Sequence, residues 1–308
     1  MATRAIAQSP GAKIGILDPS PIEHSLYAPG VMQALAELGS GGNNRVSFEY
    51  RVADGSEEMN RKRAAELVAA NCDLLIALRA EPLVRALQEL RPAAPILFLA
   101  VDYDPLARGV VTNLRRPAHN TTGVYVTQGA LIAKRVRLMR ELLPKANRLI
   151  VFADPASADQ VEATRKASAA ANLQLMLVQF QARPYNYESY LQDARALDSD
   201  AFMSLASPVF AQDRDRIHAA ISKARLPSIG TNPLQAEAGF LLSLGSNIPK
   251  LTRRVAAMGV RLLSGTKASD LAVEQADEFE LVINLKTART LGVAIPDSLL
   301  AQASRIIR

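Results

Sequence analysis

Two aspartates stand two positions apart in the segment VDYDPLARG, and their type and spacing could support chemistry. On an extended turn the carboxylates of Asp102 and Asp104 would point in similar directions. Such a pair suits Mg²⁺ coordination or general acid–base work. Asp104 also precedes Pro105, which favours a different role, a turn in which Asp104 caps a helix beginning near Leu106. We favour the cap for Asp104 and interpret Asp102 as a hydrogen-bond acceptor in a binding site.

The motifs of common enzyme classes do not occur. The turn after the expected first strand, DPSPIEHS, contains no glycine, whereas a dinucleotide site needs G-x-G-x-x-G so that the pyrophosphate can approach. A Walker loop and a G-x-S-x-G nucleophile elbow are also missing. The three histidines, His24, His119 and His218, form no H-E-x-x-H motif, and the single cysteine, Cys72, excludes an intramolecular disulfide. We therefore expect a protein without catalysis, cofactor or bound metal.

The composition is typical of a folded protein with two domains. A chain of 308 residues suits two cores of roughly 100–150 residues each. The net charge of +6 is spread among acids, and aromatic residues make up only 5%, which argues against a nucleic-acid partner. The longest apolar runs, such as PILFLAV at 95–101, are too short to span a bilayer.

Strand-like and helix-like segments alternate along the chain. Apolar or alternating runs predict a first series of strands at 12–18, 45–53, 73–78, 94–101 and 120–126, with helices at 23–39, 56–71 and 81–90. A second series has helices at 128–143, 157–171, 187–197, 210–224 and 249–264, and strands at 148–154, 173–180, 201–207, 226–230 and 240–247. This alternation predicts right-handed βαβ units, and two series predict an α/β protein of two doubly wound parallel-sheet lobes.

The ends of the expected strands contain the candidate binding residues. Ligands of open parallel sheets bind outside the carboxyl ends of the strands, and in a two-lobed protein these loops would face one cleft. The candidates at these positions are Ser20, His24, Arg79, Ala80, Glu81, Asp102, Tyr103, Tyr125, Thr127, Asp154, Ser157, Ser207, Thr231, Asn232 and Glu237. We expect all of them to be ligand-binding rather than catalytic residues.

Four segments resemble, in order and spacing, the tryptophan- and tyrosine-type substrate-binding proteins of bacterial ABC importers. FELVINLKTARTLGVAIPDSLLAQASRII at 279–307 closely follows the C-terminal signature of that family. LVAANCDLLIAL at 67–78, VDYDPLARGVVTNLRRPAHNTTGV at 101–124 and LLSGTKASDLAVEQ at 262–275 match as well. The resemblance implies a type I periplasmic-binding-protein fold, whose two lobes are joined by a hinge.

The resemblance also implies a domain division and a role. One lobe would span 12–123 plus about 247–275, and the other 124–246 plus about 276–308, with the ligand cleft between them. The protein would be a monomer that captures an aromatic or other carboxylate, or an amino acid, and delivers it to an ABC permease in the membrane. It would be periplasmic, or exported and tethered, although residues 1–13 do not resemble a signal peptide. The alternatives are a ligand-sensing regulatory domain and an enzyme on the same two-lobed fold.

Two positions depart from the family pattern. Where relatives that bind amino acids tend to have a T-P-A turn, this chain has Arg79-Ala80-Glu81-Pro82. Arg79 could clamp a ligand carboxylate through two parallel hydrogen bonds, or it could pair with Glu81 or turn outward. Relatives often carry an acid before the proline where this chain has Ser207, which weakens the case for an ammonium ligand unless Glu237 or Asp154 substitutes.

The remaining candidates would contribute weaker interactions. Tyr103 and Tyr125 could stack on a ligand ring or pack within the protein, and His24 could contact the ligand or cap a helix. Ser20, Thr127, Ser157, Thr231 and Asn232 could supply neutral hydrogen bonds. In the C-terminal signature we expect a strand in FELVIN and a helix that Asn284 caps and Gly292 ends, followed by a last helix in SLLAQASRII.

Overall fold

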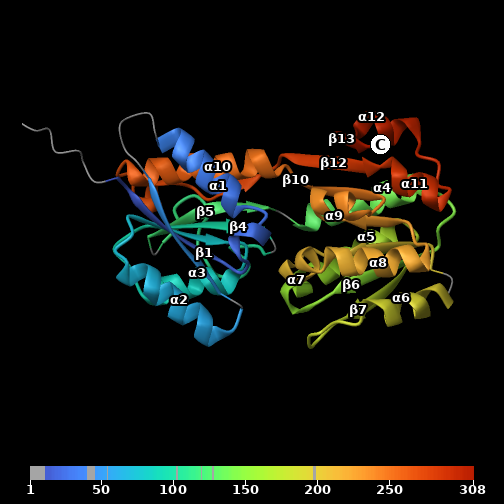
Figure 1. The fold of residues 1–308 in the computed structure, drawn as a ribbon, viewed down its shortest axis with the longest axis horizontal. Helices are drawn as coiled ribbons and strands as arrows, with labels where there is room; N and C mark the ends of the chain where they lie inside the picture. Colours follow the sequence, from blue (N-terminus) through green and yellow to red (C-terminus); the bar gives the residue numbers. More distant parts are fainter. Residues whose placement is uncertain are drawn as a thin grey trace, which may run out of the picture. The chain divides into compact units, whose positions relative to one another are not determined.

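The chain forms two compact α/β units. The computed structural model describes residues 11–39, 46–53, 55–101, 103–118, 120–126, 128–196 and 199–308. Unit 1 comprises the described residues within Met1–Ala100, Asp104–Tyr125 and Ile248–Ala276 (Figure 1). Unit 2 comprises those within Val101–Tyr103, Val126–Asn247 and Asp277–Arg308. The predicted α/β architecture with two doubly wound lobes is confirmed.

Unit 1 is built on a sheet of order β11-β5-β4-β3-β1-β2. Its strands are β1 (Lys13–Asp18), β2 (Ser47–Val52), β3 (Leu74–Leu78), β4 (Ile96–Ala100), β5 (Thr121–Val126) and β11 (Glu274–Ala276). Every residue of β3 and β4 is buried, as expected for apolar strands covered on both faces. Strands β2, β1, β3, β4 and β5 pair in parallel, so their carboxyl ends lie along one edge of the sheet.

Two pairs of helices cover the sheet of unit 1. In Figure 1, α1 (Ala28–Gly39) and α10 (Ile248–Leu263) lie on one face, and α2 (Glu57–Ala69) and α3 (Glu81–Glu89) lie on the other. The short 3₁₀ helices are η1 (Ile22–His24) and η3 (Ala268–Asp270). The hydroxyl of Ser56 accepts a 3.3 Å hydrogen bond from the Met59 amide, which confirms the predicted cap of α2.

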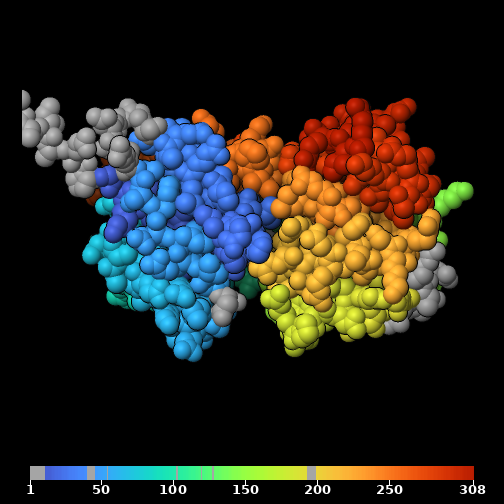
Figure 2. Space-filling model, in the orientation of Figure 1, coloured from blue at the N-terminus to red at the C-terminus, as the bar shows by residue number. Residues whose placement is uncertain are grey.

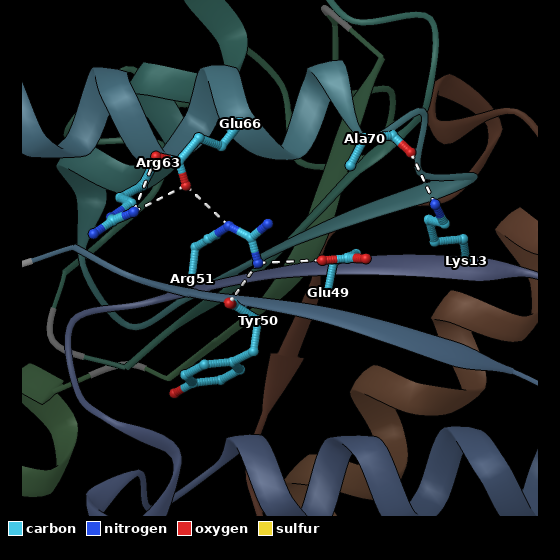
Figure 3. Close-up of polar contacts among 7 residues, drawn as sticks. All are labelled: Lys13, Glu49, Tyr50, Arg51, Arg63, Glu66 and Ala70. Atoms are coloured by element: carbon cyan, nitrogen blue, oxygen red, sulfur yellow. Dashed lines mark hydrogen bonds and ion pairs between the residues drawn. The ribbon is translucent and has the colours of Figure 1, made fainter.

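Charged side chains protect the edge strand β2 (Figure 3). Arg51 donates to Glu66 at 2.9 Å and to Glu49 at 3.2 Å, and Arg63 donates to Glu66 at 2.9 Å. The hydrogen bond from Arg63 holds the pKa of the Glu66 carboxyl below its usual range, and Arg51 adds to this effect. Charges along an edge strand discourage pairing with another chain.

Unit 2 is built on a sheet of order β13-β12-β10-β9-β8-β6-β7. Its strands are β6 (Arg148–Ala153), β7 (Gln174–Gln179), β8 (Ala201–Ser204), β9 (Ser228–Gly230), β10 (Leu242–Ser246), β12 (Phe279–Asn284) and β13 (Arg305–Ile307). Strand β12 runs antiparallel to β10, whereas β6, β7, β8, β9 and β10 pair in parallel. Aromatic rings fill part of the core, where Phe152 packs edge-on against Phe180 and Phe202 at centroid distances of 4.9 and 4.8 Å.

Eight α-helices within the described ranges belong to unit 2, together with one 3₁₀ helix. They are α4 (Gln128–Leu142), η2 (Pro155–Gln160), α5 (Val161–Ala170), α6 (Tyr187–Ala196), α7 (Pro208–Gln212), α8 (Arg214–Ala224), α9 (Pro233–Ala238), α11 (Leu285–Leu291) and α12 (Asp297–Gln302). Arg135 of α4 is fully buried, and its Nε donates to the Leu244 carbonyl at 2.9 Å. No helix of the described ranges is long and apolar enough to cross a membrane.

The C-terminal segment differs from the predicted single last helix. Helix α12 ends at Gln302, and Arg305–Ile307 form β13, which pairs in parallel with β12. The amide of Ser304 donates to the Leu281 carbonyl at 2.8 Å, and its hydroxyl accepts from the Leu281 amide at 3.2 Å, so the chain is drawn into the sheet. These C-terminal residues, red in Figure 2, form part of the surface of unit 2.

Other differences are smaller. The helix expected at 157–171 is η2 followed by α5, and the helix expected at 210–224 is α7 followed by α8. Helix α9 and strand β11 were not predicted, and both are short, at 6 and 3 residues. The predicted cap of α11 is confirmed, because Asn284 accepts a 3.1 Å hydrogen bond from the Thr287 amide and Gly292 ends the helix at φ 70°.

Candidate functional site

A buried carboxylate organises the loop at the end of β1. Asp18 is fully buried, and its oxygens accept hydrogen bonds from the Ser20 amide at 2.8 Å and the Ser25 hydroxyl at 2.6 Å. The Tyr50 hydroxyl donates to the Ser20 carbonyl at 2.6 Å. Burial raises the pKa of Asp18, and the hydrogen bonds and the charge of Arg79 only partly offset this. Asp18 therefore fixes the loop that contains the predicted residue Ser20.

Arg79 follows β3 and turns into unit 1. Its side chain is 3% exposed, and its guanidinium carbon lies 5.8 Å from the centroid of the Tyr27 ring. Its amide donates to the Leu99 carbonyl at 2.8 Å while its φ is 70°, in the left-handed region that non-glycine residues seldom adopt. The interpretation of Arg79 as an outward-facing arginine is therefore wrong. Strain of this kind tends to occur at functional sites.

The two residues after Arg79 begin α3. Ala80 is the N-cap residue of α3, and its amide donates to the Leu78 carbonyl at 2.9 Å. Glu81 begins the helix and forms an ion pair with Arg85, one turn further along. The carboxylate of Glu81 thus has a partner on its own helix. His24, the last residue of η1, is exposed, and its amide donates to the Pro21 carbonyl at 2.9 Å.

Asp104 lies in the loop after β4, and Tyr125 lies near the end of β5. Asp104 accepts hydrogen bonds from the amides of Leu106 and Ala107 at 2.8 and 3.0 Å, which confirms its predicted role in a turn. The prediction that a helix begins near Leu106 is wrong, because the chain forms only turns before Gly109, whose φ is 67°. The Tyr125 hydroxyl donates to Gln275 at 3.2 Å, and burial together with the charge of Asp104 raises its pKa.

Three predicted residues of unit 2 meet around one carboxylate. Asp154, after β6, accepts hydrogen bonds from the amide and the hydroxyl of Ser157 at 3.1 and 2.9 Å. Its other oxygen accepts a 2.5 Å hydrogen bond from the hydroxyl of Ser207, which follows β8. Asp154, Ser157 and Ser207 are 4%, 0% and 3% exposed. Ser207 occupies the position where relatives often carry an acid. Because β6 pairs with β8, Ser207 lies next to an acid that follows the adjacent strand, Asp154.

The loop after β9 contains two further predicted residues, Thr231 and Asn232. Both the amide and the hydroxyl of Thr231 donate to Gln235, at 2.6 and 3.1 Å. Asn232 caps α9 by accepting a 3.3 Å hydrogen bond from the Gln235 amide. Glu237 is exposed and forms a 2.7 Å ion pair with Arg305 of β13. Strand β13 is one edge of the sheet, whereas β6, which precedes Asp154, is next to the strand at the other edge. The structure therefore does not bring Glu237 to the Asp154 cluster.

The remaining predicted residues are Tyr103, Asp102 and Thr127. Tyr103 is 5% exposed and belongs to unit 2. Asp102 and Thr127 lie outside the described residues. Within the described ranges, no group of three or more His, Cys, Asp or Glu side chains is arranged to hold a metal ion.

Sequence reasoning missed two residues that support the site. Gln160 is 3% exposed, and its side chain donates to the Ala206 carbonyl at 2.8 Å and accepts from the Ala206 amide at 3.0 Å, which holds the chain just before Ser207. Asp18 was visible in the sequence as an acid that ends an apolar strand. Gln160 gave no such signal, because it lies in a polar helix.

The two units thus offer opposite charges at the carboxyl ends of their strands. Unit 1 has the guanidinium of Arg79, and unit 2 has the carboxylate of Asp154. Each side chain is held by its own unit, Arg79 near the Tyr27 ring and Asp154 by Ser157 and Ser207.

Comparisons with known proteins identify the family of the chain. Residues 15–307 match the family model described as ABC transporter substrate binding protein. The chain is 21% identical over 279 residues to the tyrosine-binding protein of Clostridioides difficile strain R20291, covering 86% of this chain and 76% of that protein.

Two solved structures are similar over nearly the whole chain. The conserved domain protein of Vibrio cholerae O1 biovar El Tor has a TM-score of 0.85 at 26% identity and covers 96% of this chain and 99% of that one. The ABC domain from Streptococcus pneumonia in complex with L-Trp has a TM-score of 0.83 at 23% identity, with coverages of 96% and 100%. These findings confirm the resemblance and the type I periplasmic-binding-protein fold. The chain therefore belongs to the ABC transporter substrate binding protein family, and its role is to bind a solute.

Proposed function

We propose that the solute is an amino acid and that each unit of the protein binds one of its charged groups. Asp154 is the observation that carries this proposal. Its carboxylate is buried, and its hydrogen bonds come from an amide and two hydroxyls rather than from a cation. No Lys, Arg or His among the described residues forms an ion pair with it. Because a buried charge without a counter-charge is costly, a ligand ammonium group would be favoured beside Asp154.

Arg79 would bind the carboxylate of the same ligand. Its guanidinium is held near the Tyr27 ring and close to the charge of Asp18, so little freedom remains to be lost on binding. A guanidinium presents two parallel N–H groups, which match the two oxygens of a carboxylate. Loss of either charge should therefore weaken an amino acid far more than a ligand that lacks the matching group.

The side chain of the ligand would be aromatic. The relatives support this assignment, since one is named for tyrosine and the structure of another contains L-Trp. Tyr103 and Tyr125 are the aromatic candidates for contact with the ligand ring, and Ser20, Thr231 and Asn232 are the candidates for neutral hydrogen bonds. The binding site would be a cleft between the two units, so that ligand binding drives closure about the hinge.

The remaining parts of the function follow from the family. The protein would act without chemistry, as an exported monomer in the periplasm or tethered to the membrane, and would deliver its ligand to an ABC permease. Membership in the family supports this role. Nucleic acid would not be a partner, because the basic residues are interspersed with acids.

A thermal-shift panel tests the proposal. The panel pairs L-tyrosine and L-tryptophan with the same molecules lacking the amine or the carboxylate. At a concentration 100 times its Kd, a ligand adds about 2.7 kcal/mol of stability. We expect large shifts only for the intact amino acids. Equal shifts with the compounds that lack an amine would overturn the amino-acid assignment, and turnover of a bound compound would overturn the receptor role.

A further inference from the structure

Unit 2 contains a pocket beside α4, and strands β8 and β9 separate it from Asp154. Its volume is about 340 Å³, at the small end of the range of ligand sites. Its lining includes Lys134, Arg137 and Leu138 of α4, Leu244 of β10, and Phe279 and Leu281 of β12. The strand order places β10 and β12 beyond β9, so this pocket does not include the carboxyl end of β6.

The floor of the pocket is apolar because two antiparallel strands meet α4 there. Leu244 and Leu281 are directly opposite each other on β10 and β12. Phe279 lies two residues before Leu281, and thus on the same face of the strand. Leu138, Leu244 and Leu281 are 8%, 7% and 5% exposed, so a ligand would cover little new apolar surface on them and more on Phe279.

The rim of the pocket is positively charged. Lys134 and Arg137 are exposed and lie three residues apart, so they share one face of α4. The ammonium of Lys134 lies 5.1 Å from the centroid of the Phe279 ring. In the part of the chain that the structure describes, neither cation forms an ion pair with a carboxylate. Two such cations beside an aromatic ring present donors to an anion that carries an apolar group.

One acid, Glu141, lies near these cations, four residues after Arg137 on α4, and the described residues show no ion pair between the two. Glu141 also lines the pocket, but its Oε1 accepts a 2.5 Å hydrogen bond from the hydroxyl of Ser298 in the segment that contains α12. This hydrogen bond joins the carboxylate to α12, and Lys134 lies two turns earlier on α4. The pocket is thus positive at the end near Lys134 and Phe279, and negative near Glu141.

We propose that this pocket is a second binding site, which takes a small monocarboxylate attached to a flat apolar group. The carboxylate lies between Lys134 and Arg137, and the apolar group lies against Phe279 and the leucine floor. The site is independent of the proposed amino-acid site, since it shares no residue with it.

The test uses 3-phenylpropionate as the probe and the full chain with Arg79→Gln, which removes the cation proposed to bind carboxylates in unit 1. Two-dimensional NMR titration should show saturable shifts of amides in α4 and β12. Acetate, which lacks the apolar group, and phenethylamine, which has the opposite charge, should cause none. The double substitution Lys134→Glu and Arg137→Glu should weaken 3-phenylpropionate at least roughly tenfold.

The matched control is Arg165→Glu, because Arg165 is an exposed cation on α5 of the same unit. Its Kd for 3-phenylpropionate should stay within about twofold of that of the parent. Absence of saturable shifts in α4 and β12 would overturn the proposal, as would equal affinity in the Lys134→Glu/Arg137→Glu variant. A failure of this site leaves the binding of L-tyrosine by the wild-type chain unchanged, so it is distinguishable from a failure of the proposed function.

Discussion

The hydroxyl of Ser207 donates a 2.5 Å hydrogen bond to the carboxylate of Asp154, although the two residues are 53 positions apart in the sequence. The bond joins the ends of the adjacent strands β6 and β8. Ser207 also accepts a hydrogen bond from the Val209 amide at 3.1 Å, and Gln160 holds the preceding residue. The carboxylate of Asp154 is therefore oriented before any ligand arrives, which is the condition for discriminating between ligands by charge.

Replacing Arg79 should remove recognition of the carboxylate. We expect Arg79→Gln to weaken L-tyrosine at least about tenfold, since a charge-assisted bidentate contact is lost. Tyramine, which has no carboxylate, should bind the variant and the wild type equally. Calorimetric titration measures both. Arg85→Gln on α3 is the control, because Arg85 is an arginine paired with Glu81, and it should leave the affinity unchanged. Equal affinity for L-tyrosine in Arg79→Gln would exclude Arg79 from the site.

The buried carboxyl of Asp18 should make the stability of the protein depend on pH. Burial raises the pKa of Asp18 in the folded state above its value in the unfolded chain. The contribution of Asp18 is therefore fully present below the unfolded pKa, about 3.9, and is lost as the pH rises through the folded pKa. Asp18→Asn cannot ionise, so the free energy of unfolding of the variant should rise relative to that of the wild type as the pH increases from about 4. Urea unfolding across this range provides the measurement, and a constant difference would contradict it.

Gly245 should not tolerate a side chain. A Cβ at this position would lie 2.2 Å from the carbonyl oxygen of Thr231, a backbone atom that cannot turn away. Gly245→Ala should thus lower the free energy of unfolding by about 1–3 kcal/mol, because β10 and the loop containing Thr231 must separate. Gly129→Ala in α4 is the matched control, with its nearest contact at 3.8 Å. It should be neutral or stabilise by about 0.5–1 kcal/mol in the same denaturation experiment. A loss as large as that of Gly245→Ala would refute the steric argument.

Asn284 should contribute to the stability of unit 2 through both the oxygen and the nitrogen of its side-chain amide. It accepts from the Thr287 amide at 3.1 Å and donates to the Ala236 carbonyl at 2.9 Å, while it is 4% exposed. Asn284→Ala removes the cap of α11 and leaves a buried carbonyl without this donor, so it should cost about 2 kcal/mol. Lys286→Ala on the exposed side of the same helix should change the free energy of unfolding by less than about 0.5 kcal/mol. Similar losses in the free energy of unfolding for the two variants would show that the cap stabilises the protein no more than an exposed side chain does.

Local patterns in the sequence predicted the fold well. The continuous apolar runs of β3 and β4, the cap at Ser56 and the cap at Asn284 each depend on residues close together in the chain, so they were correct. The prediction for the last segment was wrong because its structure depends on residues that are distant in the chain. Its short-range pattern favours a helix, but pairing with β12 and the hydrogen bonds of Ser304 give β13.

The site was less accessible to sequence reasoning because it depends on contacts between strands. The position of Asp154 at the end of β6 was predictable, but its contact with Ser207 requires the order of β6 and β8 in the sheet. The ion pair of Glu237 likewise depends on β13, a strand that was not predicted. The left-handed backbone of Arg79 has no signature in its residue type.

The decisive measurement asks whether Asp154 recognises the ammonium group of the ligand. It compares L-tyrosine with 3-(4-hydroxyphenyl)propionate, which lacks the amine. Each ligand is titrated into the wild type and into Asp154→Asn. Asparagine keeps an oxygen for the Ser157 amide but removes the negative charge, and Asp215→Asn, at an exposed aspartate, is the control. Calorimetry should show that the wild type prefers L-tyrosine by at least about tenfold, that Asp215→Asn keeps this preference, and that Asp154→Asn loses it. An undiminished preference for L-tyrosine in Asp154→Asn would contradict the account.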